Sequence, residues 1–365
     1  MRILILSCKT GGGHNSCAKA IEETFRGYGS FCKTEDSLSF VSKSFGEFMS
    51  KGHSLMYRRF PKIFGFGYSF AEKHPGFLKK GSPAYGIISK GGKKLFEYIE
   101  KGNFDAVICT HVFSGIVLKK AFENKERPKF KTAFVATDYT CSPGAESFDY
   151  DFFFIPDSSL SEEFIGRNVP PEKIIPSGIP VGKSFCGGEK KKFSGKEKNI
   201  LLMCGSMGCG PFKKILEELS KRLCEKFSVT AVCGNNEKLR KSLYKKYKNN
   251  NKIHIVGYTE NISSLLDKAD ICVTKPGGLS STEAAGKSVP MVLINVVEGC
   301  EKHNLEFWLK TGGAVTAETP EKIAEKCFDI LNDEIKLLKM SEAFEKVSKP
   351  FATEKIYRVI RGEKF

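Results

Sequence analysis

The sequence contains no apolar run long enough for a transmembrane helix, which needs roughly 18 or more uninterrupted apolar residues. The apolar stretch that opens the chain, Met1–Cys8, is too short for a signal peptide and lacks a small-residue cleavage site. The 13 cysteines form no CxxC pair, and their odd number and irregular spacing argue against a disulfide framework or a zinc site. These absences predict a chain of the reducing cytosol whose first strand is buried.

Acidic residues are scarce beside basic ones, since 42 Asp and Glu stand against 58 Lys and Arg and leave a net charge of +16. A strongly basic chain favours anionic partners, which include nucleic acid, phosphorylated ligands and acidic membrane surfaces. The 41% hydrophobic and 27% charged residues form an ordinary globular mixture and exclude a disordered or coiled-coil protein. The length of 365 residues suggests two domains.

Short apolar runs alternate with helical stretches, such as Phe212–Glu225 and Leu279–Ala285, and this alternation indicates parallel sheets with crossover helices. The strands expected in the first half are Arg2–Cys8, Phe104–Cys109, Thr132–Thr137 and Asp151–Ile155. Those expected in the second half are Asn199–Cys204, Ser228–Cys233, Lys252–Val256, Ile271–Thr274 and Met291–Asn295. The sequence therefore predicts an α/β protein with two doubly wound, Rossmann-like domains that face a cleft, where ligands bind at the carboxyl ends of the strands.

A stretch rich in Gly and Lys, residues 183–198, has no periodicity and is interpreted as a solvated linker. It would separate an N-terminal domain, residues 1–182, from a C-terminal domain, residues 199–349. The last segment, residues 350–365, is expected to be a helix that either caps its own domain or packs back on the first one.

A glycine-rich loop, KTGGGHN at residues 9–15, directly follows the first strand. The consecutive glycines Gly11, Gly12 and Gly13 let the backbone approach a ligand closely. His14 and Asn15 would then begin the next helix, whose positive end disfavours the imidazolium and keeps a neutral base available. The alternative is a tight turn that carries a surface histidine.

Two further loops connect a strand to a helix in the second half. The segment TKPGGLSSTEAA, residues 274–285, can bind phosphate through hydroxyls and helix N-terminal amides, and its Glu283 can accept hydrogen bonds from a ribose diol. The alternative for Glu283 is a carboxylate that complements the helix dipole. The loop CGSMGCGP, residues 204–211, fits a diphosphate cradle or a flexible turn. Glu301 and Asn304 could hydrogen-bond sugar hydroxyls.

The order of these motifs resembles one family. GGGHN is followed by TDYT (137–140), SGIPV (177–181), CGN (233–235), KPGGLSSTEA (275–284) and EGCEKHN (298–304). This series is similar to the diacylglycerol glycosyltransferases, which include the monogalactosyldiacylglycerol synthases and the processive diacylglycerol glucosyltransferases. The resemblance covers nearly the whole chain, and it implies a two-domain GT-B enzyme that takes a sugar from a UDP-sugar with inversion and needs no metal or other cofactor.

The resemblance also implies roles for individual residues. His14 or Asp138 would remove the proton of the acceptor hydroxyl, within a loop that includes Gly11, Gly12, Gly13 and Asn15. The residues matched to the UDP-sugar site are Gly205, Ser206, Gly234, Asn235, Gly257, Tyr258, Gly277, Gly278, Leu279, Ser280, Ser281, Thr282, Glu283, Glu301 and Asn304. Gly257 and Tyr258 would lie beside the uracil, and Glu283 would bind the ribose.

Half of the net charge lies in residues 50–101, which hold 11 Lys and Arg against 3 Glu together with ten aromatic residues. Basic residues interleaved with aromatic rings suit an anionic bilayer surface, while a solvated basic face is the alternative. Nucleic acid would also attract this segment, but no nucleic-acid motif accompanies it. The residues expected at the membrane are Arg58, Arg59, Phe60, Lys62, Phe64 and Phe66. We therefore expect a peripheral enzyme on the cytoplasmic face of the membrane that transfers a hexose to diacylglycerol or a glycolipid.

Two rival functions remain open at this stage. One is transfer of N-acetylglucosamine to a lipid-linked cell-wall precursor. The other is a UDP-sugar-binding GT-B protein without transferase activity, or a UDP-sugar 2-epimerase. The choice between a glucose and a galactose donor is open too, because Cys300 stands near the donor sugar where members of the family often carry Gln.

Overall fold

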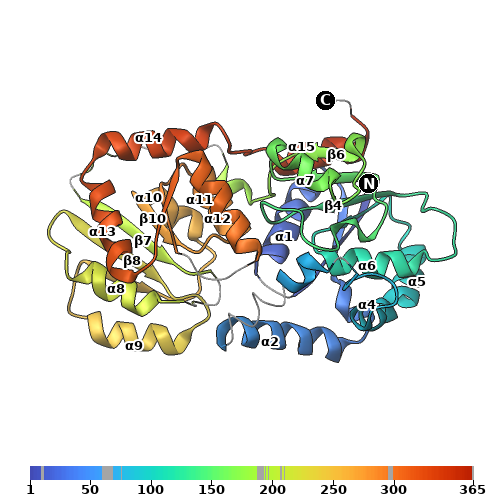
Figure 1. The fold of residues 1–365 in the computed structure, drawn as a ribbon, viewed down its shortest axis with the longest axis horizontal. Coiled ribbons are helices and arrows are strands. Elements are labelled where there is room, and N and C mark those ends of the chain that lie inside the picture. Colours follow the sequence, from blue (N-terminus) through green and yellow to red (C-terminus); the bar gives the residue numbers. More distant parts are fainter. Residues whose placement is uncertain are drawn as a thin grey trace. The chain divides into compact units, whose positions relative to one another are not determined.

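The structure is a computed structural model that describes residues 1–9, 12–59, 69–74, 76–186, 193, 195, 197–205, 208, 210–294 and 299–363. For residues 53, 54 and 56–59 it describes the backbone only. The chain forms two compact units (Figure 1). Unit 1 comprises Met1–Lys183, Glu298–Cys300 and Lys349–Phe365, and unit 2 comprises Ser184–Val297 and Glu301–Ser348.

Unit 1 is built on a six-stranded parallel sheet in the order β2-β1-β3-β4-β5-β6. Its strands are β1 (Arg2–Ser7), β2 (Phe31–Asp36), β3 (Ala106–Cys109), β4 (Lys131–Val135), β5 (Phe152–Ile155) and β6 (Ile174–Pro176). Its helices are α1 (Gly12–Gly27), α2 (Lys43–Arg59), α4 (Pro83–Ile88), α5 (Gly92–Gly102), α6 (Val112–Ala121), α7 (Ser161–Ile165) and α15 (Ala352–Arg361). Short 3₁₀ turns join them at Ser37–Phe40, Ser89–Gly91, Ala145–Ser147, Ser158–Leu160 and Pro171–Lys173.

The strand order of unit 1 reverses between β1 and β3, because β2 lies on one side of β1 and every later strand lies on the other. In a doubly wound sheet the loops after two such strands diverge to opposite faces and leave a crevice at the carboxyl edge. The glycine-rich loop follows β1, and Thr110 and His111 follow β3. Topology therefore brings these two segments together.

The last helix, α15, belongs to unit 1 although the preceding chain belongs to unit 2. The ring of Tyr357 stacks on Tyr28 at 4.5 Å between centroids and meets Phe25 edge-on at 5.0 Å, so α15 packs on α1. The Lys355 ammonium donates to the Pro176 carbonyl over 2.9 Å, which ties the helix to β6. The helix in residues 350–365 therefore packs on unit 1 and does not cap unit 2.

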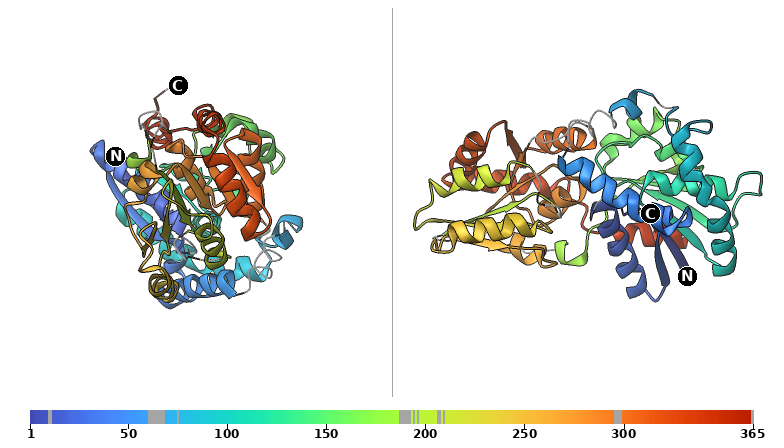
Figure 2. Two further views of the ribbon diagram at one scale, coloured as in Figure 1. Left: turned by 90° about the vertical axis from the view of Figure 1, so that its left-hand side faces the viewer. Right: turned by 90° about the horizontal axis from the view of Figure 1, so that it is seen from below.

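Unit 2 has a second six-stranded parallel sheet in the order β12-β11-β10-β7-β8-β9. Its strands are β7 (Lys198–Met203), β8 (Phe227–Val232), β9 (Ile253–Val256), β10 (Ile271–Thr274), β11 (Met291–Ile294) and β12 (Ala314–Ala317). Its helices are α8 (Phe212–Ser220), α9 (Glu237–Tyr247), α10 (Ile262–Lys268), α11 (Gly278–Gly286), α12 (Cys300–Thr311), α13 (Pro320–Leu331) and α14 (Glu334–Glu345). A 3₁₀ turn at Lys183–Phe185 stands where the unit begins, and two further views of the ribbon are given in Figure 2.

The strand order of unit 2 reverses between β7 and β10. The CGSMGCGP loop follows β7 and the KPGG turn follows β10, so the two loops predicted to bind the donor diphosphate converge at the crevice of this sheet. A β-carbon built on Gly205 would stand 3.9 Å from Cε of Lys275, which shows how closely the loops approach. The predicted fold class, two doubly wound parallel α/β units, is confirmed.

Three strands escaped the sequence prediction, namely β2, β6 and β12. All three are edge strands, and an edge strand is covered less completely than a central one. In β2 only Cys32 is buried, and β6 is three residues long and ends in Pro176. Their polar or short sequences therefore do not show the apolar runs of the central strands.

Two other expectations need correction. Helix α8 ends at Ser220, five residues before the predicted end at Glu225, since the chain must turn back to begin β8 at Phe227. The segment 183–198 is not solvated throughout, because Phe193 is buried in the apolar core of unit 2 and Lys198 already belongs to β7.

Twelve cysteines lie in the described part of the chain, and all of them are free thiols. Nine of these are buried. Within the described part, no helix has the length and apolar character needed to cross a bilayer.

Candidate functional site

His14 lies in the first turn of α1, where the sequence predicted it, and is partly exposed. Its Nδ1 lies 2.9 Å from the Thr110 carbonyl oxygen and 2.8 Å from Oγ1 of Thr137. The Thr110 hydroxyl in turn donates to the His14 carbonyl over 3.4 Å. The loops after β1, β3 and β4 are thus joined through one imidazole.

These contacts determine the tautomer of His14. A carbonyl oxygen can only accept a hydrogen bond, so Nδ1 carries the proton and donates it to Thr110. The lone pair of the neutral ring is then on Nε2. Burial lowers the pKa of His14 below its ordinary value, although the Asp138 carboxylate and the Thr110 carbonyl partly oppose this. Burial therefore keeps the ring as a neutral base.

His111 was not among the predicted site residues, yet its ring meets that of His14 edge-on at 4.5 Å between centroids. Nδ1 of His111 caps α6 by accepting from the Phe113 backbone N–H over 3.1 Å. Nδ1 therefore carries no proton, and neutral His111 has its N–H on Nε2, the opposite tautomer to His14. The available sequence signal was the dipeptide Thr110-His111 directly after a buried strand.

Other predicted residues of unit 1 surround this pair. Asp138 is half-buried and close enough to His14 to act on its pKa. Oδ1 of Asn15 accepts from the Ser7 hydroxyl over 2.9 Å, which ties α1 to the end of β1. Gly12 and Gly13 open α1, while Gly11 lies outside the described residues.

The amino end of α11 in unit 2 lies at the predicted diphosphate site. Gly277 precedes the helix in an extended conformation, and no side chain caps it. The first backbone amides of a helix have no partner within the helix, so those of Gly278, Leu279 and Ser280 are available to an anion. Ser280 is partly exposed, whereas Gly278 and Leu279 are buried.

The structure corrects the prediction for two hydroxyls. Ser281 is fully buried, and its Oγ donates to the Gly277 carbonyl and accepts from Nε1 of Trp308, both over 2.7 Å. The Thr282 hydroxyl donates to the Gly278 carbonyl over 2.6 Å. Both hydroxyls therefore hold the first turn of α11 in place, which leaves the backbone amides as the donors of this turn that are open to an anion.

Glu283 follows in the second turn of α11 and is partly exposed. Burial raises the pKa of Glu283 to about 8. A carboxyl in this state is mostly protonated near neutral pH, and a ligand that donates hydrogen bonds to it favours its ionised form. Strongly shifted pKa values of this kind cluster at binding and catalytic positions.

Lys275 and Glu301 form an almost buried ion pair beside α11, with Nζ and Oε1 3.3 Å apart. Lys275 comes from the KPGG turn but was not predicted as a site residue, and it places a cation near the loop of Gly205. Asn304, one turn after Glu301 on α12, is fully buried. The predicted sugar-binding residues thus share one helix face.

The glycines of the predicted diphosphate cradle have the backbone conformation that requires glycine. Gly205, Gly208 and Gly234 have φ values of +66°, +56° and +56°. A β-carbon on Gly208 would lie 2.2 Å from the Cys233 carbonyl oxygen, so the loops after β7 and β8 are in contact there. Ser206 lies outside the described residues.

The neighbouring loop uses a residue that the prediction missed. Asn235, the predicted residue, is exposed. Asn236 instead donates from Nδ2 to the Gly208 carbonyl over 3.2 Å, and its Oδ1 caps α9 by accepting from Leu239 over 3.1 Å. The signal was an Asn that stands directly before a helical stretch.

The two residues matched to the uracil loop lie after β9. Tyr258 is 60% exposed, so its ring is available for stacking. Gly257 lies against Arg240, since a β-carbon there would come within 3.0 Å of the Arg240 side chain. The Arg240 guanidinium is held by both carboxylate oxygens of Glu237 over 2.6 and 2.8 Å.

Of the residues expected at the membrane, Phe60, Lys62, Phe64 and Phe66 lie outside the described residues, and Arg58 and Arg59 are described only as the last backbone positions of α2. The described neighbours do expose large apolar side chains. Those with more than a third of their surface exposed are Phe48, Leu55, Phe70, Phe77 and Ile87.

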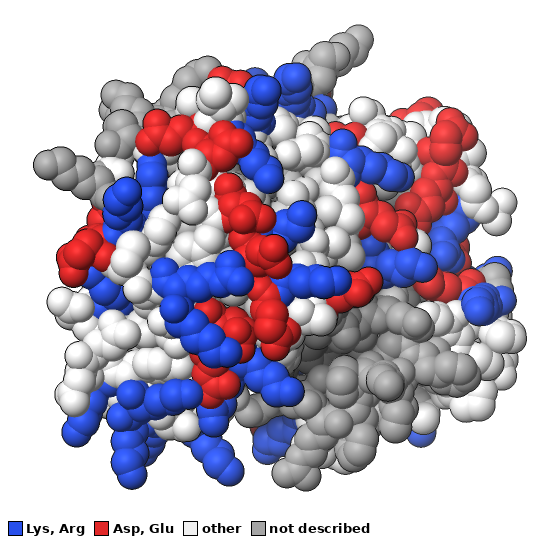
Figure 3. Space-filling view, turned by 60° about the vertical axis from the view of Figure 1, so that its left-hand side comes forward, with Lys and Arg blue, Asp and Glu red and all other residues white. Residues whose placement is uncertain are grey.

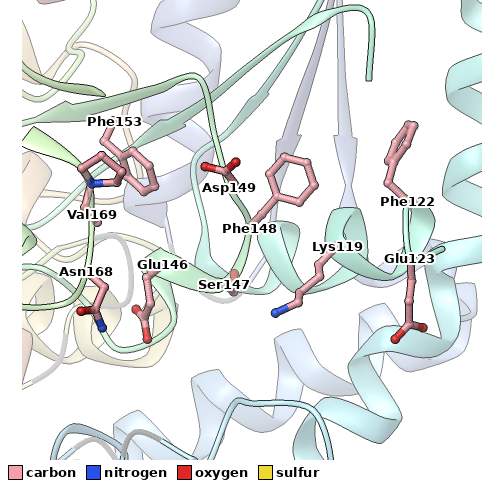
Figure 4. A pocket seen from close by; sticks show the side chains of 11 residues that line it. Lys119, Phe122, Glu123, Glu146, Ser147, Phe148, Asp149, Phe153, Asn168 and Val169 are labelled. Carbon is pink, nitrogen blue, oxygen red and sulfur yellow. The ribbon is translucent and has the colours of Figure 1, made fainter. Parts of the chain in front are cut away.

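A pocket of about 480 Å³ lies in unit 1 away from these residues (Figure 4). It is lined by the last turn of α6 and the following chain, including Lys119 and Glu123, and by Phe148 and Asn168. His111 stands before the first residue of α6, and a ten-residue helix is roughly 15 Å long. The pocket is therefore separate from the His14 site. Among the described residues, no group of three or more His, Cys, Asp or Glu side chains is arranged to hold a metal ion.

Each half of the chain matches the model of a glycosyltransferase family. Residues 14–181 match the family model of monogalactosyldiacylglycerol (MGDG) synthase, and residues 199–356 match that of the glycosyltransferase family 28 C-terminal domain. The chain is 28% identical, over 99% of its length and 94% of the relative's, to the processive diacylglycerol beta-glucosyltransferase of Bacillus cereus strain G9842. It is 27% identical, with the same coverage, to the protein of that name in Bacillus anthracis strain CDC 684.

Among solved structures, MurG of Acinetobacter baumannii is similar with a TM-score of 0.66, 15% identity and 99% coverage of both chains. The UDP-GlcNAc 2-epimerase from Neisseria meningitidis is similar with a TM-score of 0.63, 13% identity and full coverage of both chains. At such low identity these likenesses show the fold, which is GT-B.

Proposed function

Because this chain belongs to the family of glycosyltransferases that joins a monogalactosyldiacylglycerol synthase domain to a glycosyltransferase family 28 C-terminal domain, we propose that it transfers a hexose from a UDP-sugar to diacylglycerol or a related glycolipid. The observation that carries the proposal is the hydrogen bond from Nδ1 of His14 to the Thr110 carbonyl, which gives the first residue of the matched domain a basic Nε2. The names of the curated relatives support diacylglycerol as the acceptor.

The chemical step is a displacement at the anomeric carbon. Nε2 of His14 accepts the proton of the acceptor hydroxyl as its oxygen attacks, and the UDP leaves from the opposite face with inversion. The charge that develops on the diphosphate is stabilised by the α11 amides and by Lys275. These groups supply the stabilisation that a divalent cation gives in other enzymes, so we propose a metal-independent reaction.

In the donor site, the Glu283 carboxylate accepts hydrogen bonds from the ribose diol, and Tyr258 stacks on the uracil. Glu301 contacts the sugar, whereas Asn304, which was also predicted to do so, is fully buried and has no surface with which to reach it. Ionised Glu283 is the form that binds, because two hydroxyl donors stabilise a carboxylate more than a carboxylic acid. Either UDP-glucose or UDP-galactose fits this description.

We further propose that the enzyme is a peripheral protein on the cytoplasmic face of the membrane. Phe48 and Leu55 are 70% and 50% exposed and stand seven residues apart on α2, so they share one helix face. Apolar side chains beside the basic residues of 50–101 suit the interface of an anionic bilayer. Changing Arg58, Arg59 and Lys62 to Gln should weaken binding to anionic vesicles by roughly a hundredfold, while transfer to a water-soluble short-chain acceptor is retained.

The function is tested with purified enzyme, diacylglycerol vesicles and a panel of UDP-glucose, UDP-galactose and UDP-N-acetylglucosamine. We expect a hexosyl-diacylglycerol by mass analysis, a β-linkage by NMR if the reaction inverts an α-linked donor, and unchanged turnover with a chelator present. Transfer of N-acetylglucosamine to a lipid-linked cell-wall precursor would favour the first rival. An epimerised UDP-sugar without any transfer would favour the second rival, a UDP-sugar 2-epimerase, and a solved enzyme of that kind has the same fold.

A further inference from the structure

Two segments of the chain together carry as much net positive charge as the whole chain. Residues 50–101 carry a net charge of +8, and residues 213–252, with 12 Lys and Arg against 4 Glu, carry +8 as well. Together they equal the whole net charge of +16, so charges elsewhere balance. The second segment belongs to unit 2, not to the unit in which a membrane contact was expected.

Residues 213–252 form α8, β8 and α9, and the two helices are neighbours because Nζ of Lys246 lies 2.7 Å from Oε1 of Glu217. Each of the four glutamates is paired, with Lys246, Lys221, Lys252 and Arg240 as their partners. In Figure 3, Lys and Arg side chains gather along the lower left edge of the face that is shown. Within the described chain, eight basic residues of this segment make no ion pair: Lys213, Lys214, Arg222, Lys226, Lys238, Lys241, Lys245 and Lys248.

Four of these lysines form a stripe along α9. Lys238, Lys241, Lys245 and Lys248 follow one another at intervals of three, four and three residues, so they share one helix face and are all exposed. The opposite face is anchored by Leu243 and Tyr247, which are buried. The stripe extends over roughly 15 Å.

The arrangement of the α9 stripe suits a surface of spread negative charge. Its ammonium groups project from a convex helix about one turn apart, whereas a site for a single phosphate needs donors that converge. Beside the stripe, the Tyr244 ring is 58% exposed, and an amphipathic ring of this kind favours the headgroup level of a bilayer. We propose that the α9 stripe is a membrane contact of unit 2, which holds the UDP-sugar unit on anionic lipid.

This inference rests on the proposed function, because a lipid acceptor requires the enzyme to work at a bilayer. Two other anionic partners, nucleic acid and the UDP-sugar itself, fit the stripe less well. Nucleic acid is disfavoured because proteins that bind single strands stack successive bases on several aromatic rings. Among the described side chains of α9, Tyr244 is the one exposed aromatic ring. Steering of the UDP-sugar would act on a soluble donor and therefore would not depend on lipid.

The test changes all four stripe lysines to Gln in the full-length protein. Binding is measured by flotation with vesicles of phosphatidylcholine alone and with phosphatidylglycerol added. A lysine near an anionic surface contributes about fivefold to binding, so the loss should be at least tenfold even if only two of the four reach the lipid. Salt should weaken wild-type binding and reduce the difference between the two proteins.

The matched control changes four other exposed lysines of unit 2 to Gln, namely Lys268, Lys310, Lys339 and Lys346, which lie on α10, α12 and α14 and at the end of α14. It removes the same charge, so it should bind nearly as wild type if position matters. Transfer to a short-chain soluble acceptor should stay unchanged in both variants, which also reports that they fold.

The outcomes separate the two proposals. If wild type fails to bind anionic vesicles, the membrane part of the proposed function is wrong. If wild type binds these vesicles and the stripe variant binds them as well as wild type does, only the α9 inference is wrong. The same holds if the stripe variant binds no more weakly than the control variant. A stripe variant that loses binding to single-stranded RNA, or raises the donor KM with the soluble acceptor, while keeping vesicle binding, overturns it in favour of nucleic acid or donor steering.

Discussion

The pKa of Glu283 makes donor binding depend on pH in a direction that can be predicted. Burial raises this pKa to about 8, so the carboxyl of the free enzyme is mostly protonated near neutral pH. In the proposed donor site the ribose diol binds the ionised form, and donor binding should therefore release a proton. Donor affinity should rise with pH up to about 8 and then level off.

The magnitude follows from the fraction of enzyme in the binding form. At about pH 7, one pH unit below the pKa, roughly one molecule in ten has ionised Glu283. The apparent Kd is increased by the inverse of that fraction, so it should fall close to tenfold between about pH 7 and pH 9. This corresponds to about 1.4 kcal/mol of binding free energy.

The assay is calorimetric titration with a UDP-sugar, whose diphosphate diester does not titrate in this range. Glu283→Gln should remove the pH dependence and bind the donor at least tenfold more weakly than wild type at high pH, because it loses a charge-assisted acceptor. The exposed Glu306→Gln on α12 is the matched control and should retain the wild-type profile. A wild-type Kd that stays constant with pH, or that rises as pH increases, would refute the assignment of ionised Glu283 to the ribose.

The same pKa has a consequence for stability. Glu283 holds its proton more tightly in the folded chain than in the unfolded one, where its ordinary value is 4.5. Its stabilising contribution is therefore complete below that value and is lost as pH rises towards about 8. Glu283→Gln, which resembles the protonated acid, should melt above wild type at about pH 8, and the difference should shrink as pH falls and disappear below the ordinary value of 4.5. A lower Tm for the variant at high pH would contradict burial as the cause.

Three further changes test the rest of the site. His14→Ala should lower kcat by roughly 10²–10⁴ while the Kd of the UDP-sugar hardly changes. The control, His254→Ala at an exposed position, should match wild type. If His14→Ala weakens donor binding as much as it lowers kcat, His14 is not the base. Trp308→Phe removes the hydrogen bond to the buried Ser281 hydroxyl, which should cost about 1–3 kcal/mol and lower the Tm measured by circular dichroism by several degrees. Gly208→Ala requires an L side chain at φ +56° against a carbonyl, so it should raise the donor KM or unfold the loop, and wild-type kinetics would show that the loop tolerates a β-carbon.

How much of the fold the sequence predicts depends on where each strand lies in its sheet. The central strands β1, β3, β7 and β10 are covered by helices on both faces, and their apolar runs identify them directly. The edge strand β2, FCKTED, buries one residue and is hidden among polar residues. Pairing with β1 along its whole length, rather than local sequence, makes it a strand.

The candidate site was predictable where backbone conformation limits the choice of residue. Glycines at positive φ, such as Gly205 and Gly208, are required by tight loops and are visible as motifs. Side-chain partners were not predictable in the same way. Ser281 stands within the predicted phosphate-binding motif, yet its hydroxyl donates to the Gly277 carbonyl and accepts from Trp308, 27 positions later. Contacts between distant residues of this kind depend on packing and leave no local pattern.

The two units show why the position of the loops could be predicted, whereas the protonated state of Glu283 could not. Their strand orders differ, because the first strand of unit 1, β1, is second from the β2 edge, whereas the first strand of unit 2, β7, is third from the β9 edge. In both units the strand order nevertheless reverses beside this first strand. A chain that winds helices to both faces of a sheet must leave its crevice there, so the loop after the first strand is at the site in either topology. The protonation of His14 and Glu283 depends instead on how far later elements exclude water from each group. That exclusion lowers the pKa of the imidazole and raises that of the carboxyl, so one cause makes His14 a neutral base and Glu283 a group that ionises when its ligand arrives.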